Sequence, residues 1–195
     1  VVTRRLRELV GEERERVARQ KLAIRLRMIL EAKRDGRRKG RLILQGFREP
    51  LHWDVGGTDS PVANLSTVRA QVFRSNRCKR TGRRKVLSSC DVSVAFLQSD
   101  EFDASDHLRY VYMREHKHAD DRIFQLLGPL YGQRSASRRW HATFKKWLQS
   151  EGYEPGSNEP CAFYHSGRDH TVVLWVDDIL SDGTLEVSEL FYASL

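Results

Sequence analysis

The 195-residue sequence has only three cysteines, and their positions exclude two common classes of small protein. Cys78, Cys90 and Cys161 show no paired spacing, so neither a disulfide framework nor a zinc knuckle is indicated. Apolar residues make up 39% of the chain, enough for a core, but they form no run of membrane-spanning length. Nothing resembles a signal peptide, so we expect an intracellular protein outside the membrane. The chain starts at Val1 rather than Met, which indicates a fragment of something longer.

Two motifs that would define other functional classes are incomplete. Gly56 and Gly57 lie in a glycine-rich loop, but that loop lacks the spacing and the lysine of a nucleotide-binding P-loop. His116 and His118 lie far from other ligand types, so surface histidines explain them better than a zinc site does. Neither a P-loop nucleoside triphosphatase nor a zinc protein is therefore expected.

Positive charge is concentrated at the start of the chain. Residues 1–40 hold fourteen basic and six acidic residues, whereas residues 41–195 hold twenty of each. A basic extension on a neutral body suits a polyanionic partner, although improved solubility alone explains it as well. A second basic stretch, residues 69–85, has eight Lys or Arg residues and no acid.

Residues 4–33 are rich in Arg, Glu, Leu and Ala and contain no proline, which favours a helix. Apolar residues three or four apart would form one stripe on it: Leu6, Leu9, Val10, Ala18, Leu22, Leu26, Ile29 and Leu30. A solvated helix docked on a neighbour is the preferred interpretation, and a nucleic-acid-binding helix is the alternative.

Two strand-like segments end in carboxylates. Residues 171–176 are uncharged and mostly β-branched or aromatic, and Asp177 and Asp178 interrupt the apolar run that follows. Asp91 stands near the end of a second such segment, residues 85–92. Adjacent buried carboxylates need a compensating partner, and a divalent cation with oxygen ligands is the commonest one. A hairpin turn whose two acids face water is the alternative.

The remaining elements are short and alternate along the chain. Strands are expected at residues 42–44, 110–113, 123–127 and 162–164, with a hairpin between the last of these and residues 171–176. Helices are expected within residues 61–72, 94–97 and 137–152.

Six blocks of the sequence, in order, resemble the reverse transcriptase of copia-type long-terminal-repeat retrotransposons. They are residues 39–47 (KGRLILQGF), 60–69 (with SPVA and TVR), 90–97 (with CDV and AFL), 111–113 (VYM), 130–140 (LYG, then Arg138 and Trp140) and 175–178 (WVDD). The resemblance covers roughly residues 37–183. The sequence departs from the family pattern at Ala136 and Ser137, where the family has Ser-Pro, and at Trp175, where it has Tyr.

The resemblance implies an α+β fold of the right-hand polymerase type. Residues 37–195 would form fingers and a palm, the palm being a ferredoxin-like antiparallel sheet with helices. Residues 1–36 would precede them as a basic helical segment. The chain would stop before the thumb and RNase H segments of the family.

The resemblance also implies nucleotidyl transfer with two Mg²⁺ ions, for which Mn²⁺ could substitute. The 3′-hydroxyl of a primer attacks the α-phosphate of a deoxynucleoside triphosphate, and pyrophosphate leaves. Asp91 and Asp177 are expected to bridge the metals with the backbone carbonyl of Val92, and Asp178 is expected to be a weaker ligand.

Other roles follow from the same resemblance. Lys39 and Arg41 would grip the triphosphate, and Phe96 would screen the 2′ side of the sugar, or else serve only as a core aromatic. The remaining expected contacts, to the nascent base pair or the primer and template, are Tyr131, Gly132, Trp175, Gln45 and Arg138.

The partners implied are an RNA template, a DNA primer, deoxynucleoside triphosphates and the rest of a Pol polyprotein, in the cytoplasm within a virus-like particle or in the nucleus. A different function remains open: an inactive relic that only binds nucleic acid through its basic face. A purely structural helical adaptor would leave the carboxylates unexplained.

Overall fold

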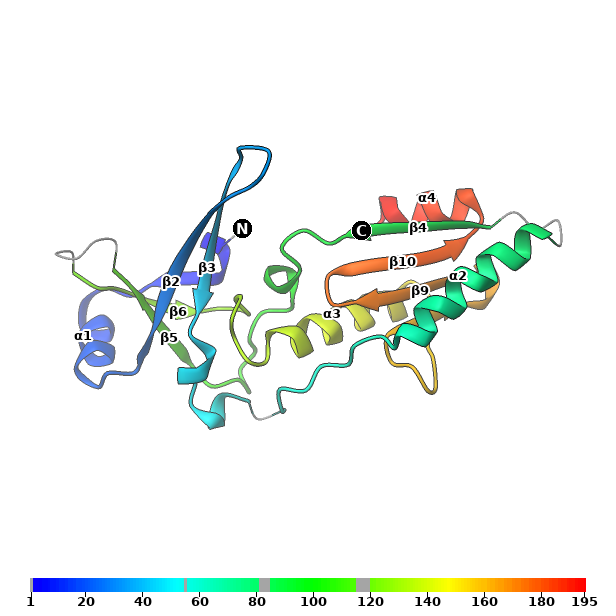
Figure 1. The fold of residues 1–195 in the computed structure, drawn as a ribbon. Helices are drawn as coiled ribbons and strands as arrows, with labels where there is room; N and C mark the ends of the chain where they lie inside the picture. Colours follow the sequence, from blue (N-terminus) through cyan, green and yellow to red (C-terminus); the bar gives the residue numbers. More distant parts are fainter. Residues whose placement is uncertain (1, 55, 81–84, 115–119) are drawn as a thin grey trace. The chain divides into compact units, whose positions relative to one another are not determined.

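The computed structural model describes residues 2–54, 56–80, 85–114 and 120–195. Over these residues the chain is a mixed α+β protein with two five-stranded sheets and four α-helices (Figure 1). It divides into two compact units, residues 1–59 with 96–140 and residues 60–95 with 141–195. The predicted α+β class is confirmed, whereas the domain boundary after residue 36 stays a prediction. Among the helices of the described residues, none is long and apolar enough to span a membrane.

The first unit is built on a sheet with the strand order β1-β6-β5-β2-β3. Its strands are β1 (Leu6–Glu8), β2 (Ala23–Ala32), β3 (Arg38–Leu44), β5 (Arg109–Met113) and β6 (Arg122–Leu126). β2 and β5 run parallel, and the other neighbours run antiparallel. Helix α1 (Gly11–Arg19) connects β1 to β2, and short 3₁₀ turns complete the unit: η1 (Val2–Arg5), η2 (Gly46–Arg48), η3 (Leu51–Asp54) and η4 (Ala95–Gln98).

The core of this unit is formed by alternate residues of its strands. In β3 Leu42 and Leu44 are buried while their neighbours are not, as the period of two in a strand requires. They pack in one cluster with Ile24, Leu26, Trp53, Leu97, Val111, Phe124, Leu126 and Leu130. Burying a side chain of this size contributes roughly 1.5–3 kcal/mol to folding, so the cluster dominates the stability of the unit.

The prediction of one helix over residues 4–33 is wrong for most of its length. Only α1 is α-helical there, and residues 23–32 form β2. Apolar and charged residues alternate in the run Ile24-Arg25-Leu26-Arg27-Met28, and this period of two favours a strand. The apolar spacing over the longer range, residues 4–33, favours a helix equally well. Pairing with β3 and β5, which local propensity cannot anticipate, decides between them.

The second unit is built on an antiparallel sheet with the strand order β4-β10-β9-β8-β7. Its strands are β4 (Val86–Asp91), β7 (Glu154–Pro155), β8 (Ala162–His165), β9 (His170–Trp175) and β10 (Asp178–Gly183). The β8–β9 hairpin and the β4 strand lie where the sequence predicts them. The 3₁₀ turn η5 (Ser166–Arg168) closes the hairpin.

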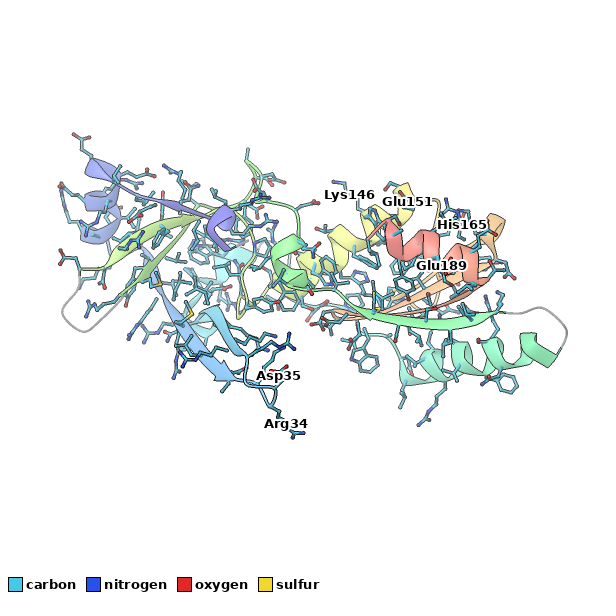
Figure 2. All side chains as sticks on the ribbon, turned by 90° about the horizontal axis from the view of Figure 1, so that it is seen from above. Arg34, Asp35, Lys146, Glu151, His165 and Glu189 are labelled. Atoms are coloured by element: carbon cyan, nitrogen blue, oxygen red, sulfur yellow. The ribbon has the colours of Figure 1, made fainter. Side chains whose placement is uncertain are left out.

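Helices cover both faces of the second sheet. Figure 2 shows α2 (Leu65–Arg80) on one side and α3 (Ala136–Ser150) with α4 (Leu185–Ala193) on the other. The predicted helix over residues 137–152 is confirmed by α3, where Phe144 and Leu148 are buried four residues apart. On the opposite face, the Gln71 side chain of α2 donates to the backbone oxygens of Thr171 and Leu180. Helix α4 was not predicted.

A buried histidine lies between this sheet and α4. His170 has no exposed surface, and its Nδ1 atom is 2.7 Å from the hydroxyl oxygen of Tyr153. Within the described residues its Nε2 atom has no hydrogen-bond partner. Burial lowers the pKa of His170 to about 4, with the nearby Asp182 carboxylate opposing the shift.

This histidine is expected to make the protein less stable in mild acid. In the unfolded chain His170 takes up a proton near pH 6.5, whereas in the folded chain it does so only near pH 4. Its contribution is therefore fully present above pH 6.5 and declines as the pH falls, by about 2 kcal/mol at pH 5. Urea unfolding carried out above pH 6.5 and at pH 5 measures this loss of unfolding free energy. A His170→Gln variant should lose about 2 kcal/mol less than the wild type over that range, and equal losses would contradict the assignment.

Candidate active site

The hairpin that joins β9 to β10 has a two-residue turn. Trp175 and Asp178 pair across it, and Val176 and Asp177 form the turn itself. Val176 has a φ of 58°, a left-handed conformation that is rare and strained for a β-branched residue. The strained residue thus directly precedes the two adjacent acids, Asp177 in the turn and Asp178 at the start of β10.

Strand β4 lies against the other side of β10 and brings a third acid to the same row. Asp91 is the cross-strand partner of Asp178, and Asp178 is also the partner of Trp175. Directly opposite residues of antiparallel strands project from the same face, with Cα atoms about 4.5–5.5 Å apart. Beyond the end of β4, the Val92 N–H donates to the backbone oxygen of Asp177, at 2.8 Å.

A cavity of about 710 Å³ opens on this face of the sheet. Asp91, Asp178 and Trp175 line it together with Ser89 of β4, and α2 contributes Leu65 and Val68. No Lys, Arg or His is among its lining residues within the described part of the chain. Within the described residues the cavity is therefore acidic and partly apolar, with no positive side chain among its lining to balance its two carboxylates.

The local field of these acids is visible in the pKa of a neighbouring thiol. Burial raises the pKa of Cys90, and the negative charges of Asp91 and Asp178 raise it further. The negative charges of Asp91 and Asp178 are therefore both close to the Cys90 thiol, near the end of β4.

The acids of this cavity suit a divalent metal that is shared with a substrate. No three His, Cys, Asp or Glu side chains of the described residues lie close enough together to form a complete protein metal site. Mg²⁺, however, is usually held by one or two carboxylates together with substrate phosphates and water. The Asp91–Asp178 pair fits that pattern, because it offers two facing carboxylates and leaves the other positions to the substrate.

The prediction that the adjacent carboxylates are buried is wrong. Asp91 and Asp178 are exposed, and Asp177 is half-buried, so their burial does not by itself demand a counter-ion. The strands are buried along most of their length, but the acids stand at the end of the sheet where water reaches them. What favours a cation is the proximity of like charges rather than desolvation.

The residues expected to grip a triphosphate lie on β3 in the first unit. Lys39 is exposed and pairs across the sheet with Glu31 of β2. The Arg41 guanidinium forms an ion pair with the same carboxylate, at 2.5 Å. Both cations project from one face of the β2–β3 hairpin, because residues two apart in a strand share a face.

Three further predicted contacts gather beside the end of β3. The backbone oxygen of Tyr131 accepts a hydrogen bond from the Leu44 N–H, at 2.8 Å, and the rings of Phe96 and Tyr131 are 5.2 Å apart. Gly132 has a φ of 81°, and a Cβ there would lie 2.3 Å from the Leu44 backbone oxygen. Only glycine allows this close approach.

The residues predicted to contact primer and template are divided between the units. Gln45 follows β3, and its buried Oε1 atom has no hydrogen-bond partner among the described residues. The Arg138 guanidinium donates to the Gly57 backbone oxygen, at 3.1 Å. Trp175 belongs to the acidic row of the second unit. His116 and His118, expected to be ordinary surface residues, lie outside the described residues.

Comparison with known proteins assigns the family. A family model described as "Reverse transcriptase (RNA-dependent DNA polymerase)" matches residues 16–190. The chain belongs to this reverse transcriptase family. The match begins inside α1 and includes every strand except β1.

Curated relatives of this reverse transcriptase chain are transposon polyproteins. It is 24% identical over 179 residues to the "Retrovirus-related Pol polyprotein from transposon TNT 1-94" of Nicotiana tabacum, covering 84% of this chain and 12% of the relative. It is 26% identical over 162 residues to the "Truncated transposon Ty1-A Gag-Pol polyprotein" of Saccharomyces cerevisiae, covering 82% and 12%. The chain thus spans about an eighth of the length of these relatives, and its resemblance to copia-type reverse transcriptases is confirmed.

The predicted site residues leave out part of the cavity wall. Leu65, Val68 and Ser89 were not among them, although Ser89 is two residues from Asp91 and so had to share its face. The α2 residues gave no comparable signal, because only tertiary packing brings that helix to the sheet.

Proposed function

We propose that this chain is the RNA-directed DNA polymerase domain of a copia-type Pol polyprotein, with the second unit as the palm and the first as the fingers. One observation supports this most: Asp91 and Asp178 face each other across β4 and β10 on the wall of a cavity that has no basic residue among its described lining. Family membership supports the same class of reaction.

In this proposal the acids hold divalent cations at the junction of primer and nucleotide. Asp91 and Asp177 provide carboxylate oxygens, Val92 provides its backbone carbonyl, and Asp178 provides a weaker contact. Two Mg²⁺ ions, or Mn²⁺ in their place, would stabilise the attacking 3′-oxygen and the leaving pyrophosphate. Trp175, in the same row of side chains, would contact the primer end, because an exposed aromatic ring offers a base a stacking surface.

The first unit would bind the incoming nucleotide. Lys39 and Arg41 offer charge-assisted hydrogen bonds to the triphosphate. Phe96, in contact with Tyr131, would screen the 2′ side of the sugar, and Gly132 would let the backbone approach the nascent base pair. Gln45 and Arg138 would contact primer or template.

Primer extension tests the proposal. The chain is incubated with a labelled DNA primer on an RNA template, deoxynucleoside triphosphates and either Mg²⁺ or Mn²⁺. We expect longer products with metal and none after chelation. A chain that binds the primer–template but extends nothing with either metal would contradict the polymerase proposal.

A second candidate is a catalytically inactive relic that binds nucleic acid. The observation that favours it is the exposed run of basic residues around the β2–β3 hairpin, Lys33, Arg34, Arg37, Arg38 and Lys39. Salt-sensitive binding without extension, unchanged by Asp177→Asn, is the result expected of such a module.

A further inference from the structure

The outer face of α2 carries exposed apolar side chains beside a positive charge. Over residues 65–76, the part of α2 whose side chains the structure describes, the helix has two arginines and no acid. Arg69 lies three residues before Val72 and four before Phe73, so the three side chains share one face of the helix. All three are exposed, and Phe73 is 67% exposed, whereas Gln71 on the other side of α2 is buried. We call Arg69, Val72 and Phe73 the α2 face.

Helix α4 has the same kind of outer face with the opposite charge. Its nine residues include two acids and no Lys or Arg. Leu185 and Glu189 lie four residues apart, as do Glu186 and Leu190, so these four side chains share one side of the helix. All four are exposed, and Leu190 is 62% exposed, whereas Phe191 is buried. We call the four exposed residues the α4 face. Clustered exposed apolar side chains of this kind mark interaction surfaces.

The charges of both faces have no partner within the described part of the chain. There, the side chains of Arg69, Glu186 and Glu189 form no ion pair and no hydrogen bond. The other arginine of α2 is different, because the Arg74 guanidinium lies 3.2 Å from a carboxylate oxygen of Asp182. The unpaired charges therefore belong to the two exposed faces.

The two faces cannot meet within one chain. Helices α2 and α4 lie on opposite faces of the second sheet (Figure 2), and each has its buried side toward that sheet. Pairing of identical faces is also unfavourable. Two α2 faces would bring two copies of Arg69 together, and two α4 faces would bring four carboxylates together. Only the α2 face of one copy against the α4 face of another joins apolar surfaces and opposite charges at once.

We propose that copies of this chain associate head to tail, with the α2 face of one copy packed on the α4 face of the next. Phe73 would pack on Leu185 and Leu190, and Arg69 would lie between the two glutamates. Such a contact is heterologous, and it builds an open row of copies because its two faces lie on opposite sides of the unit. Stable interfaces engage about 20–30 residues a side, so these small faces give weak, reversible association. The contact includes none of the proposed metal ligands.

Sedimentation velocity tests this contact, using nuclease-treated protein over a hundredfold range of concentration, about 5–500 µM. The weight-average sedimentation coefficient of the wild type should rise over this range. Arg69→Glu and Glu189→Arg each bring like charges together at the contact, and each should weaken association about tenfold. Both positions are exposed, so both variants are expected to fold.

An equimolar mixture of these two variants makes the charges complementary again. The α2 face of Arg69→Glu then meets the α4 face of Glu189→Arg, and the mixture should associate about tenfold more tightly than either variant alone. Association through residual nucleic acid, or through another surface, gives no such rescue.

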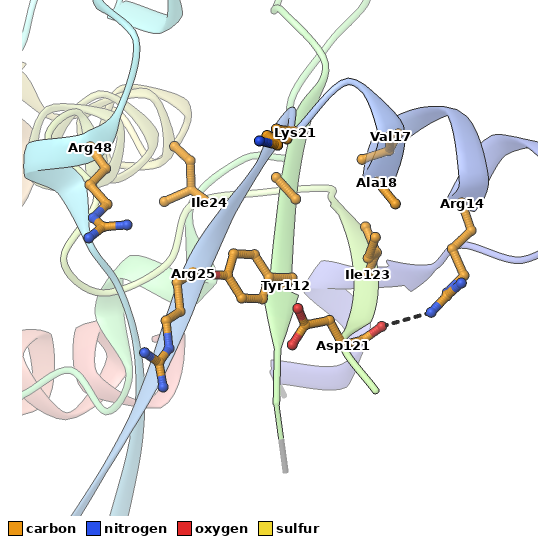
Figure 3. Close-up of a pocket in the computed structure, with 11 residues that line it drawn as sticks. Arg14, Val17, Ala18, Lys21, Ile24, Arg25, Arg48, Tyr112, Asp121 and Ile123 are labelled. Carbon is orange, nitrogen blue, oxygen red and sulfur yellow. Dashed lines mark hydrogen bonds between the residues drawn. The ribbon is translucent and has the colours of Figure 1, made fainter. Parts of the chain in front are cut away.

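Two control variants make the same changes of charge away from both faces. Arg25→Glu is in the first unit, where Arg25 is exposed beside Tyr112 (Figure 3). Glu154→Arg is in the second unit, where Glu154 is exposed on β7. Both variants should associate like the wild type.

Three results would overturn the proposal. They are a wild type that stays monomeric over the whole range, reversals that weaken association no more than their controls, and a mixture that associates no more tightly than its components. Asp91→Asn should associate like the wild type, and primer extension by dilute protein requires no second copy. The outcome of this test is therefore independent of the outcome for catalysis.

Discussion

Primer extension by an Asp91→Asn variant is expected to fall by about 10³-fold or more, with the fold and primer binding unchanged. Asn has the shape of Asp but lacks the negative charge that a hard cation requires. Asp91 is exposed at the end of β4, so the substitution leaves no buried group without a partner. Single-turnover extension, compared at saturating metal, measures the loss.

The control for this variant is Glu189→Gln, which removes one carboxylate charge from the exposed surface of α4 in the same unit (Figure 2). It should extend primers at the wild-type rate. Comparing Asp177→Asn with Asp178→Asn shows which of the two adjacent acids matters more for extension, and we expect the larger loss of extension rate for Asp177→Asn. The opposite order would assign the main ligand pair to Asp91 and Asp178, which are cross-strand partners.

A Lys85→Met variant is expected to lose about 3 kcal/mol of unfolding free energy in the second unit. Lys85 is buried immediately before β4, with its Nζ atom 2.8 Å from a carboxylate oxygen of Asp169 and 3.9 Å from one of Asp182. Asp182 has no exposed surface. Removing one partner of a buried ionic group leaves the other charge uncompensated, and such losses are typically about 3–5 kcal/mol. Arg74, 3.2 Å from Asp182, keeps the loss at the lower end.

Urea unfolding followed by tryptophan fluorescence, to which Trp147 and Trp175 of the second unit contribute, measures this loss. Lys146→Met, on the exposed surface of α3 in the same unit, is the matched control and should change the free energy by less than about 0.5 kcal/mol. A double variant, Lys85→Met/Asp182→Leu, should be more stable than Lys85→Met alone because it leaves no lone buried acid. If the double variant loses the sum of two single losses, the two charges are not coupled.

Strands with strong local signals, and the β8–β9 hairpin, were predicted correctly from the sequence, whereas strand β10 and its pairing with β4 were not. The uncharged run ending at Trp175 and the segment ending at Asp91 are the clearest examples. Their register, which brings Asp91 opposite Asp178, depends on contacts between residues more than eighty positions apart. Local periodicity carries no information about such pairing.

In the N-terminal residues the local signal itself predicted the wrong secondary structure. Their composition favours a helix, yet β2 gains backbone hydrogen bonds to β3 and β5 and buries Ile24 and Leu26 in the core. Tertiary burial outweighs helix propensities that differ by less than about 1 kcal/mol per residue.

Gly46 lies against Gly132, and the close contact between the two glycines makes both positions intolerant of substitution. A methyl group at Gly46 would lie 2.1 Å from the Gly132 backbone oxygen, so two peptide segments touch with no side chain between them. Retrotransposon copies accumulate random substitutions once selection ceases, and any replacement at either glycine would push these segments apart. Genomic sister copies could therefore be sorted by inspecting two codons, with damaged copies recognised before any protein is made.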